Sequence, residues 1–133
     1  MTKTDKMKLA YSATSQRSFD EIVADVERKV AENGFKVLYV HNVQQTMKDK
    51  GFDFPPYKII ELCNAKLAYA VLQEDRNIGL MLPCKINVYE KDGKRFIVGM
   101  LPTLITEFFP EASLGSVPQE VENVIKKIID EVK

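Results

Sequence analysis

Apolar and polar residues alternate along several segments of the chain with the two-residue period of a β-strand. In residues 7–15, the apolar Met7, Leu9, Tyr11 and Ala13 stand at every second position, which predicts a strand with one buried face. Residues 35–40 are apolar at nearly every position, a pattern typical of a central strand covered on both faces. Asp92 and Gly93 lie between two further apolar runs and predict the turn of a β-hairpin. The five predicted strands cover residues 7–15, 35–40, 57–63, 84–90 and 95–101.

Between these strands, apolar residues recur every three or four positions and predict amphipathic helices. Ser18 and Glu21 have the spacing of a capping box, which satisfies free backbone donors at the start of the first helix. A second such pair, Ser116 and Gln119, precedes the last helix. Residues 102–116 predict a loop with a turn or two of structure. The predicted helices cover residues 19–33, 43–50, 65–75 and 117–133.

The order of these elements predicts a single compact α+β domain over residues 1–133, with residues 1–6 as a loose N-terminal segment. Because a hairpin joins two of the strands, we expect a mixed or antiparallel sheet with the helices packed mainly on one face. The other face would expose apolar side chains, since residues 35–40 and 95–101 are apolar in both alternating sets. A two-fold contact with a second copy is the commonest way to cover such a face, so the pattern predicts a homodimer.

Composition and charge limit the kinds of partner and the cellular compartment that we expect for this protein. The chain has 133 residues, 45% apolar and 29% charged, as in ordinary globular proteins. Because 19 basic residues balance 19 acidic ones, we expect no nucleic-acid binding. No apolar run is long enough for a membrane span. Two cysteines and a start without a secretory pattern predict a cytoplasmic protein with free thiols. The charged residues of the last helix, Glu122 among them, are expected to face solvent.

The two cysteines are the strongest candidates for chemistry, because the sequence has no Gly-rich phosphate loop, no CxxC pair and no GxSxG motif. Cys63 ends a predicted strand and precedes Asn64, the predicted N-cap of the next helix. A helix N-terminus favours a thiolate and would lower the pKa of that thiol. Cys84 has the strand parity of Ile86 and Val88, so it should face an apolar side of the sheet. For either residue, simple packing in the core is the alternative interpretation.

Glu61 and His41 are the further candidates. Glu61 interrupts an otherwise apolar strand and has the parity of Ile59 and Cys63. A carboxylate in that position faces solvent on a half-exposed sheet, finds a partner, or has a raised pKa. His41 ends its own predicted strand and could lie near the same edge, although an exposed histidine at a strand end usually has no special role.

The segment from Gly51 to Glu90 resembles the domain of unknown function 302 family. Two motifs carry the resemblance: ELCN, which contains Glu61 and Cys63, and LMLPC, which ends at Cys84. An alternating strand with the letters VYE follows them. The resemblance implies a compact α+β domain that tends to form homodimers, and it implies no substrate, cofactor or reaction.

Three functions remain open on this basis. The leading hypothesis is a dimeric domain that binds a small ligand or a metal ion in a cleft lined by Glu61, Cys63 and Cys84, with His41 as a further ligand. Two thiolates would suit a soft metal. The second is a structural or interaction module without a ligand. The third is a thiol enzyme with Cys63 as its nucleophile and Glu61 or His41 as the base, and we rank it below the roles without catalysis.

Overall fold

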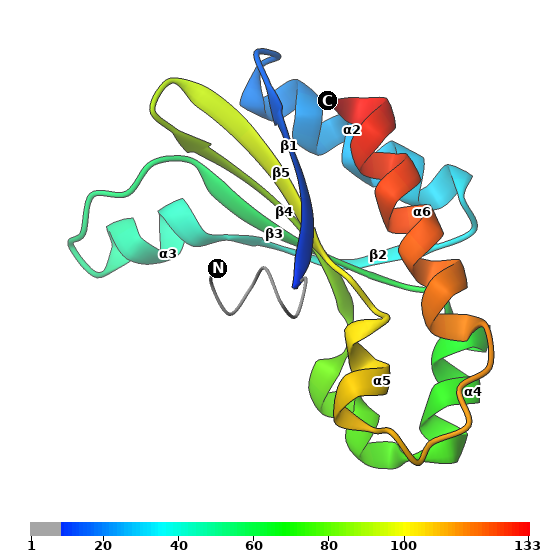
Figure 1. The fold of residues 1–133 in the computed structure, drawn as a ribbon. Coiled ribbons are helices and arrows are strands. Elements are labelled where there is room, and N and C mark those ends of the chain that lie inside the picture. Colours follow the sequence, from blue (N-terminus) through cyan, green and yellow to red (C-terminus); the bar gives the residue numbers. More distant parts are fainter. Residues whose placement is uncertain (1–8) are drawn as a thin grey trace, which may run out of the picture.

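Five antiparallel strands form one sheet in the order β1-β5-β4-β3-β2 (Figure 1). The structure is a computed structural model and describes residues 9–133, so the segment 1–6 that we predicted to be loose lies outside the described residues. Each strand pairs antiparallel with its neighbours, which resolves the predicted choice between a mixed and an antiparallel sheet. The strands are β1 Ala10–Ser15, β2 Lys36–Asn42, β3 Tyr57–Cys63, β4 Cys84–Lys91 and β5 Lys94–Met100.

The two longest helices cover one face of this sheet, which confirms the predicted α+β architecture. In Figure 1, α2 and α6 lie along one face, while α3 projects from the other side and α4 and α5 extend beyond one end of the sheet. None of the helices in residues 9–133 has the length and hydrophobicity that crossing a membrane requires. The helices are α2 Phe19–Glu32, α3 Val43–Asp49, α4 Ala65–Glu74, the 3-10 helix η1 Arg76–Met81, α5 Leu104–Phe108 and α6 Val117–Val132.

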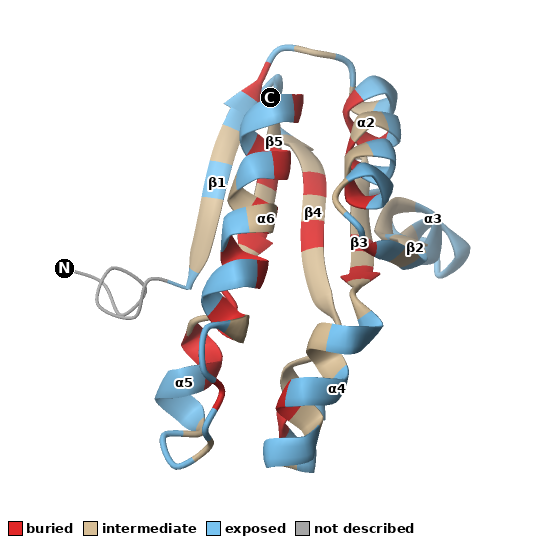
Figure 2. Ribbon diagram, turned by 90° about the vertical axis from the view of Figure 1, so that its right-hand side faces the viewer, coloured by how far each residue is buried: buried red, intermediate tan, exposed pale blue. Residues whose placement is uncertain are grey.

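The main core lies between the sheet and these two helices. Figure 2 shows the buried residues along the inner sides of α2 and α6 and on the strands beneath them. Ile60 and Leu62 of β3 and Ile86 and Val88 of β4 are fully buried on this face, as strand alternation requires. Gly99 of β5 lets α6 approach the sheet closely. The buried α2 and α6 residues of this core are Ile22, Val23, Val26, Val30, Val121, Ile125, Ile128, Ile129 and Val132.

Of the two predicted capping boxes, only the Ser18 side-chain cap of α2 is present. The Ser18 hydroxyl accepts from the backbone N–H of Glu21, as predicted for the start of α2, and donates to the Glu21 carboxylate, which takes the place of the predicted bond from a backbone N–H to Glu21. At the start of α6, Ser116 makes no side-chain cap, and its hydroxyl donates to the Glu120 carboxylate instead. The predicted box of Ser116 and Gln119 is therefore wrong.

Strand β2 is an edge strand, so the prediction of a central strand over residues 35–40 is wrong. Within residues 9–133, β3 is the one strand that pairs with it, and the pairing is interrupted by a register shift between Val37 and Tyr39. The bulge turns Leu38 and Tyr39 outward, where they are 51% and 59% exposed. The nearly continuous apolar pattern thus reflects side chains on an uncovered surface as well as side chains in the core.

Candidate functional site

A narrow apolar pocket lies where β3 ends and β4 begins. Its cavity is about 40 Å³ and opens partly to solvent. It lies between the main core and a second buried cluster formed by Val71, Ile78, Ile105 and Leu114. The side chains around it come from the strand ends and from the helices beyond the sheet. They include Phe35, Leu62, Leu67, Ala68, Val71, Leu82, Ile105, Val117 and Val121.

The structure brings both cysteines to this pocket. Cys84 is the Cα partner of Leu62 and packs against the main core, as its parity with Ile86 predicted. Cys63 is the last residue of β3 and lines the pocket at the strand end. Asn64 follows it and accepts a hydrogen bond from the backbone N–H of Leu67 at 3.2 Å, which is the predicted N-cap of α4.

The surroundings of both thiols oppose ionisation. Burial raises the pKa of Cys63, so the predicted lowering by the helix N-terminus is wrong. Burial and the nearby Cys63 raise the pKa of Cys84 to about 11. No disulfide joins the two cysteines in the structure, and the raised pKa of each thiol favours its protonated form at neutral pH. The pocket therefore presents two neutral, polarisable thiols rather than a nucleophile.

We expect native alkylation to be slow at both cysteines and faster at Cys63 than at Cys84. Cys84 is the more strongly perturbed thiol, and at a pKa near 11 only about one molecule in ten thousand is ionised at pH 7. Mass spectrometry with iodoacetamide, using Cys63→Ser and Cys84→Ser as controls, measures the two rates. Because the raised pKa of Cys63 comes from burial, Glu61→Gln should leave its rate unchanged. Faster labelling of Cys84 would contradict this account.

Glu61 and His41 do not join the cysteines at the pocket, so the predicted four-residue cleft is wrong. Glu61 is the Cα partner of Lys85 and Tyr39, and alternation places it on the face opposite to Leu62. His41 lies on that same open face, and its Nε2 is 2.9 Å from the Thr46 hydroxyl. The sequence placed Glu61 and Cys63 on the same face because they are two residues apart in one strand. The pocket lies at the end of that strand, where Cys63 reaches it and Glu61 does not.

The pocket also lacks the ligands of a metal site. Its lining contains two thiols and neither a carboxylate nor an imidazole. Across residues 9–133, no group of three or more histidine, cysteine, aspartate or glutamate side chains is placed to hold a metal ion. A small apolar group fits the lining better than a cation does.

Sequence reasoning missed a polar contact beside the pocket. Glu122 of α6 is 6% exposed, although we predicted it to face solvent. Its carboxylate accepts a 2.6 Å hydrogen bond from the Thr103 hydroxyl and lies 3.1 Å from Lys126 Nζ. Since Pro102 and Val121 line the pocket, this contact fastens α5 to α6 at the pocket wall. A carboxylate between Val121 and Ile125 in the apolar stripe was the signal available in the sequence.

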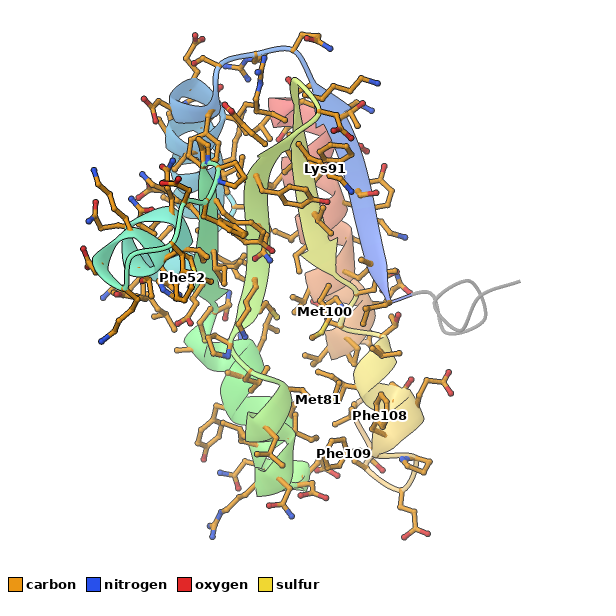
Figure 3. The ribbon with its side chains drawn as sticks, turned by 90° about the vertical axis from the view of Figure 1, so that its left-hand side faces the viewer. Phe52, Met81, Lys91, Met100, Phe108 and Phe109 are labelled. Atoms are coloured by element: carbon orange, nitrogen blue, oxygen red, sulfur yellow. The ribbon has the colours of Figure 1, made fainter. Side chains whose placement is uncertain are left out.

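The uncovered face of the sheet is a second distinctive surface. Figure 3 views this side of the molecule, with Phe52 beside α3 and Met100 at the end of β5. The rings of Tyr57, Tyr89 and Phe96 stack across three strands, with centroids 5.2 and 5.1 Å apart. These residues are only half-buried, so a band of apolar surface remains open to solvent.

Comparisons with known proteins agree with this fold. A family described as "Domain of unknown function DUF302" matches residues 11–132. The crystal structure of an uncharacterized conserved protein DUF302 from Bacillus stearothermophilus superimposes with a TM-score of 0.86 and 28% sequence identity. That match covers 94% of this chain and 98% of the other. No curated protein matches the chain.

Proposed function

Since this chain belongs to the DUF302 family of domains of unknown function, we propose that it is a binding domain for a slim aliphatic group, such as the end of an alkyl chain. The observation that carries this proposal is the lining of the end pocket. Apolar side chains from β3, α4, α5 and α6 converge there, and Cys63 and Cys84 add two protonated thiols. Ligand sites are commonly apolar clefts of this kind with few polar groups.

The same lining argues against the two other uses of the cysteines. A metal would require thiolates, but the pKa of each thiol is raised by burial. A thiol enzyme would require a base near the sulfur, whereas Glu61 and His41 lie on the other face of the sheet. A neutral ligand needs neither condition, and polarisable sulfur makes favourable contacts with apolar groups.

The size of the cavity limits the ligand and implies a movement. A cavity of about 40 Å³ is smaller than the roughly 150 Å³ that admits benzene in a protein core. The second buried cluster contains four buried side chains, of which only Ile78 is fully buried, so the segment formed by α4, η1 and α5 is more weakly packed than the main core. We infer that this segment moves away from the sheet when an alkyl chain enters between the two clusters.

Filling the pocket tests the proposal. Ala68 lines the pocket, while Ala70 on the same helix is exposed. We expect Ala68→Met to weaken the binding of 1-hexanol at least tenfold, because the added side chain occupies the site. Titration followed by amide chemical shifts measures the affinity and locates the site near Cys84 and Val71.

Ala70→Met is the matched control, because it adds the same side chain to the same helix outside the pocket. It should bind 1-hexanol as the wild type does. If the wild type shows no saturable shifts around Cys84, or if both variants bind equally, the end pocket is not the binding site.

We further infer that the domain works as a homodimer, with the open sheet face covered by a second copy. The exposed band on that face is the supporting observation. Five strands at about 4.8 Å spacing and about 7 residues long give a face of roughly 500 Å² per copy, which reaches about 1,000 Å² in total. With 19 basic and 19 acidic residues, net charge does not oppose self-association.

Light scattering coupled to size-exclusion chromatography tests the dimer. We expect a mass of about twice 15.2 kDa at micromolar concentration, since about 1,000 Å² in total is the area at which a well-matched face becomes a biological interface. Tyr89→Glu should shift the mass towards 15.2 kDa, because it would place a charge inside the aromatic stack. Lys127→Glu, on the exposed side of α6 and away from the open sheet face, serves as the control. A wild-type mass that stays near 15.2 kDa would exclude the dimer.

A further inference from the structure

The open face carries three parallel rows of side chains that run across the strands. The central row is Ile59, Asn87 and Val98, which are Cα partners on β3, β4 and β5, and it continues to Ser12 on β1. On one side lies the aromatic row of Tyr57, Tyr89 and Phe96. On the other side lies the Lys85 row, in which Glu61 and Lys85 are Cα partners and Met100 follows by continuing the β4–β5 register one residue beyond the Ile86–Gly99 pair. All nine side chains on β3, β4 and β5 are half-buried.

The arrangement of the three rows indicates how two copies of the open face would be related by symmetry. We propose that two copies pack open face to open face about a two-fold axis that runs along the central row, between the two sheets. This inference rests on the proposed homodimer and adds its geometry. Such an axis places the central row against itself and the Lys85 row of each copy against the aromatic row of the other, because the two rows lie at equal distances from the axis.

The facing rows are chemically complementary under this symmetry. Lys85 meets the face of the partner's Tyr89, which is a cation–π contact. Met100 meets the partner's Phe96, which is a sulfur–aromatic contact. Glu61 meets the hydroxyl of the partner's Tyr57. That hydroxyl already accepts a hydrogen bond from Asn87 Nδ2 at 3.0 Å, so its own hydrogen is free to donate to the carboxylate.

Asn87 is the polar residue that suits a position on the axis. It lies on β4, the middle strand of the sheet, and its Oδ1 is buried without a hydrogen-bond partner among the described residues. A residue on a two-fold axis meets its own copy, so a lysine or a glutamate there would be repelled. An amide is uncharged, so Asn87 meets its own copy on the axis without repulsion, and the second hydrogen of Nδ2 is not used by Tyr57. Oδ1 is covered by its own chain, so it takes no part in the contact with the partner.

The other two-fold arrangement centred on Asn87 is less favourable. An axis along β4 would also place Asn87 against its copy, but it would bring Lys85 against the partner's Lys85. It would also place the exposed Ser12 about 19 Å across the face from the partner's Ser12, since β1 lies two strands from β4. Along the proposed axis the two Ser12 residues face each other across the sheets. Ser12 thus distinguishes the two arrangements.

Cross-linking tests the axis. In a Cys63→Ser background, we expect Ser12→Cys to form covalent dimers with a short bis-maleimide. Thr14→Cys is the matched control: it is an exposed residue on the same strand and face, about 7 Å from the axis, so its copies lie about 14 Å apart along the strands. Thr14→Cys should therefore cross-link poorly. As a second readout, Lys85→Ala should raise the dimer dissociation constant about tenfold through the loss of two cation–π contacts.

The outcomes separate the existence of the dimer from the direction of its two-fold axis. A wild type that is monomeric excludes the dimer itself and with it the axis. A dimeric wild type in which Thr14→Cys cross-links as well as Ser12→Cys, or in which Ser12→Cys does not cross-link, keeps the dimer and overturns the axis. Tighter association of Lys85→Ala would indicate the axis along β4, because that change would remove a repulsion between the two lysines.

Discussion

Replacing Gly99 with alanine is expected to lower the free energy of unfolding by about 2 kcal/mol. A Cβ at position 99 would lie 2.5 Å from Cγ2 of Ile125 and 3.1 Å from Cδ1 of Ile129. Both isoleucines are fully buried, and Cγ2 branches directly from the Cβ of Ile125, so it cannot swing aside. The helix α6 must therefore shift away from β5 and loosen the main core. Chemical denaturation of both proteins measures the difference.

Gly79→Ala is the control for this substitution. The added Cβ would lie 3.7 Å from Cδ2 of Leu72, which is an ordinary contact, so we expect a change below about 1 kcal/mol. Combining Gly99→Ala with Ile125→Leu should recover part of the lost stability, because leucine has no methyl branch at Cβ. If Gly99→Ala unfolds at the wild-type midpoint, α6 does not approach β5 as closely as the structure shows.

Replacing Glu122 with alanine should destabilise the protein by about 2 kcal/mol at pH 7, because it removes charge-assisted hydrogen bonds from a buried site. Thr103 loses its acceptor, and Lys126 loses its ion pair. The expected damage is greatest where α5 joins α6, so amide exchange should rise more in α5 than in α2. Glu120→Ala, which changes an exposed glutamate on the same helix, should cost less than about 1 kcal/mol.

The effect of Glu122 depends on pH in a defined direction. Burial tends to raise the pKa of its carboxyl, but the hydrogen bonds from Thr103 and Lys126, with the charge of Lys126, outweigh burial and hold the pKa below the ordinary value of 4.5. A carboxyl with a lowered pKa in the folded state stabilises the protein fully above its unfolded pKa. The stabilisation is lost as the pH falls through the folded value. The difference between wild type and Glu122→Ala should therefore be largest near neutral pH and should shrink below pH 4.5. A constant difference down to pH 3 would contradict the assignment.

Local patterns in the sequence predicted the strands and the longer helices of the fold, but not the 3-10 helix η1 or the edge position of β2. The start of α2 at Ser18 and the cap at Asn64 follow from side chains that satisfy their own neighbouring backbone groups. The β4–β5 hairpin follows from the turn at Asp92 and Gly93, both of which have positive φ. Strand order, in contrast, is determined by pairing between distant segments. A run of six residues with five apolar side chains, 35–40, therefore could not show that β2 lies at an edge.

The candidate site was also predicted only in part, because local patterns do not show which distant segments meet. The parity of Cys84 with Ile86 placed it correctly on the helical face, because alternation within one strand is a local property. The grouping with Glu61 failed because the pocket is built where several elements meet beyond the strand ends. Glu122 was missed because its partner Thr103 lies 19 residues away, and no local pattern reports that distance.

The bulge in β2 has a consequence for solubility in the cell. An edge strand with free N–H and C=O groups is a template on which other chains can add strands and grow into fibres. The register shift between Val37 and Tyr39 breaks the regular spacing of those groups, so an incoming strand would find its hydrogen bonds out of step. Lys36 adds a charge at the start of the same edge. Growth from this edge is thereby blocked, and removal of Leu38 to restore a regular strand should make the protein prone to amyloid-like aggregation.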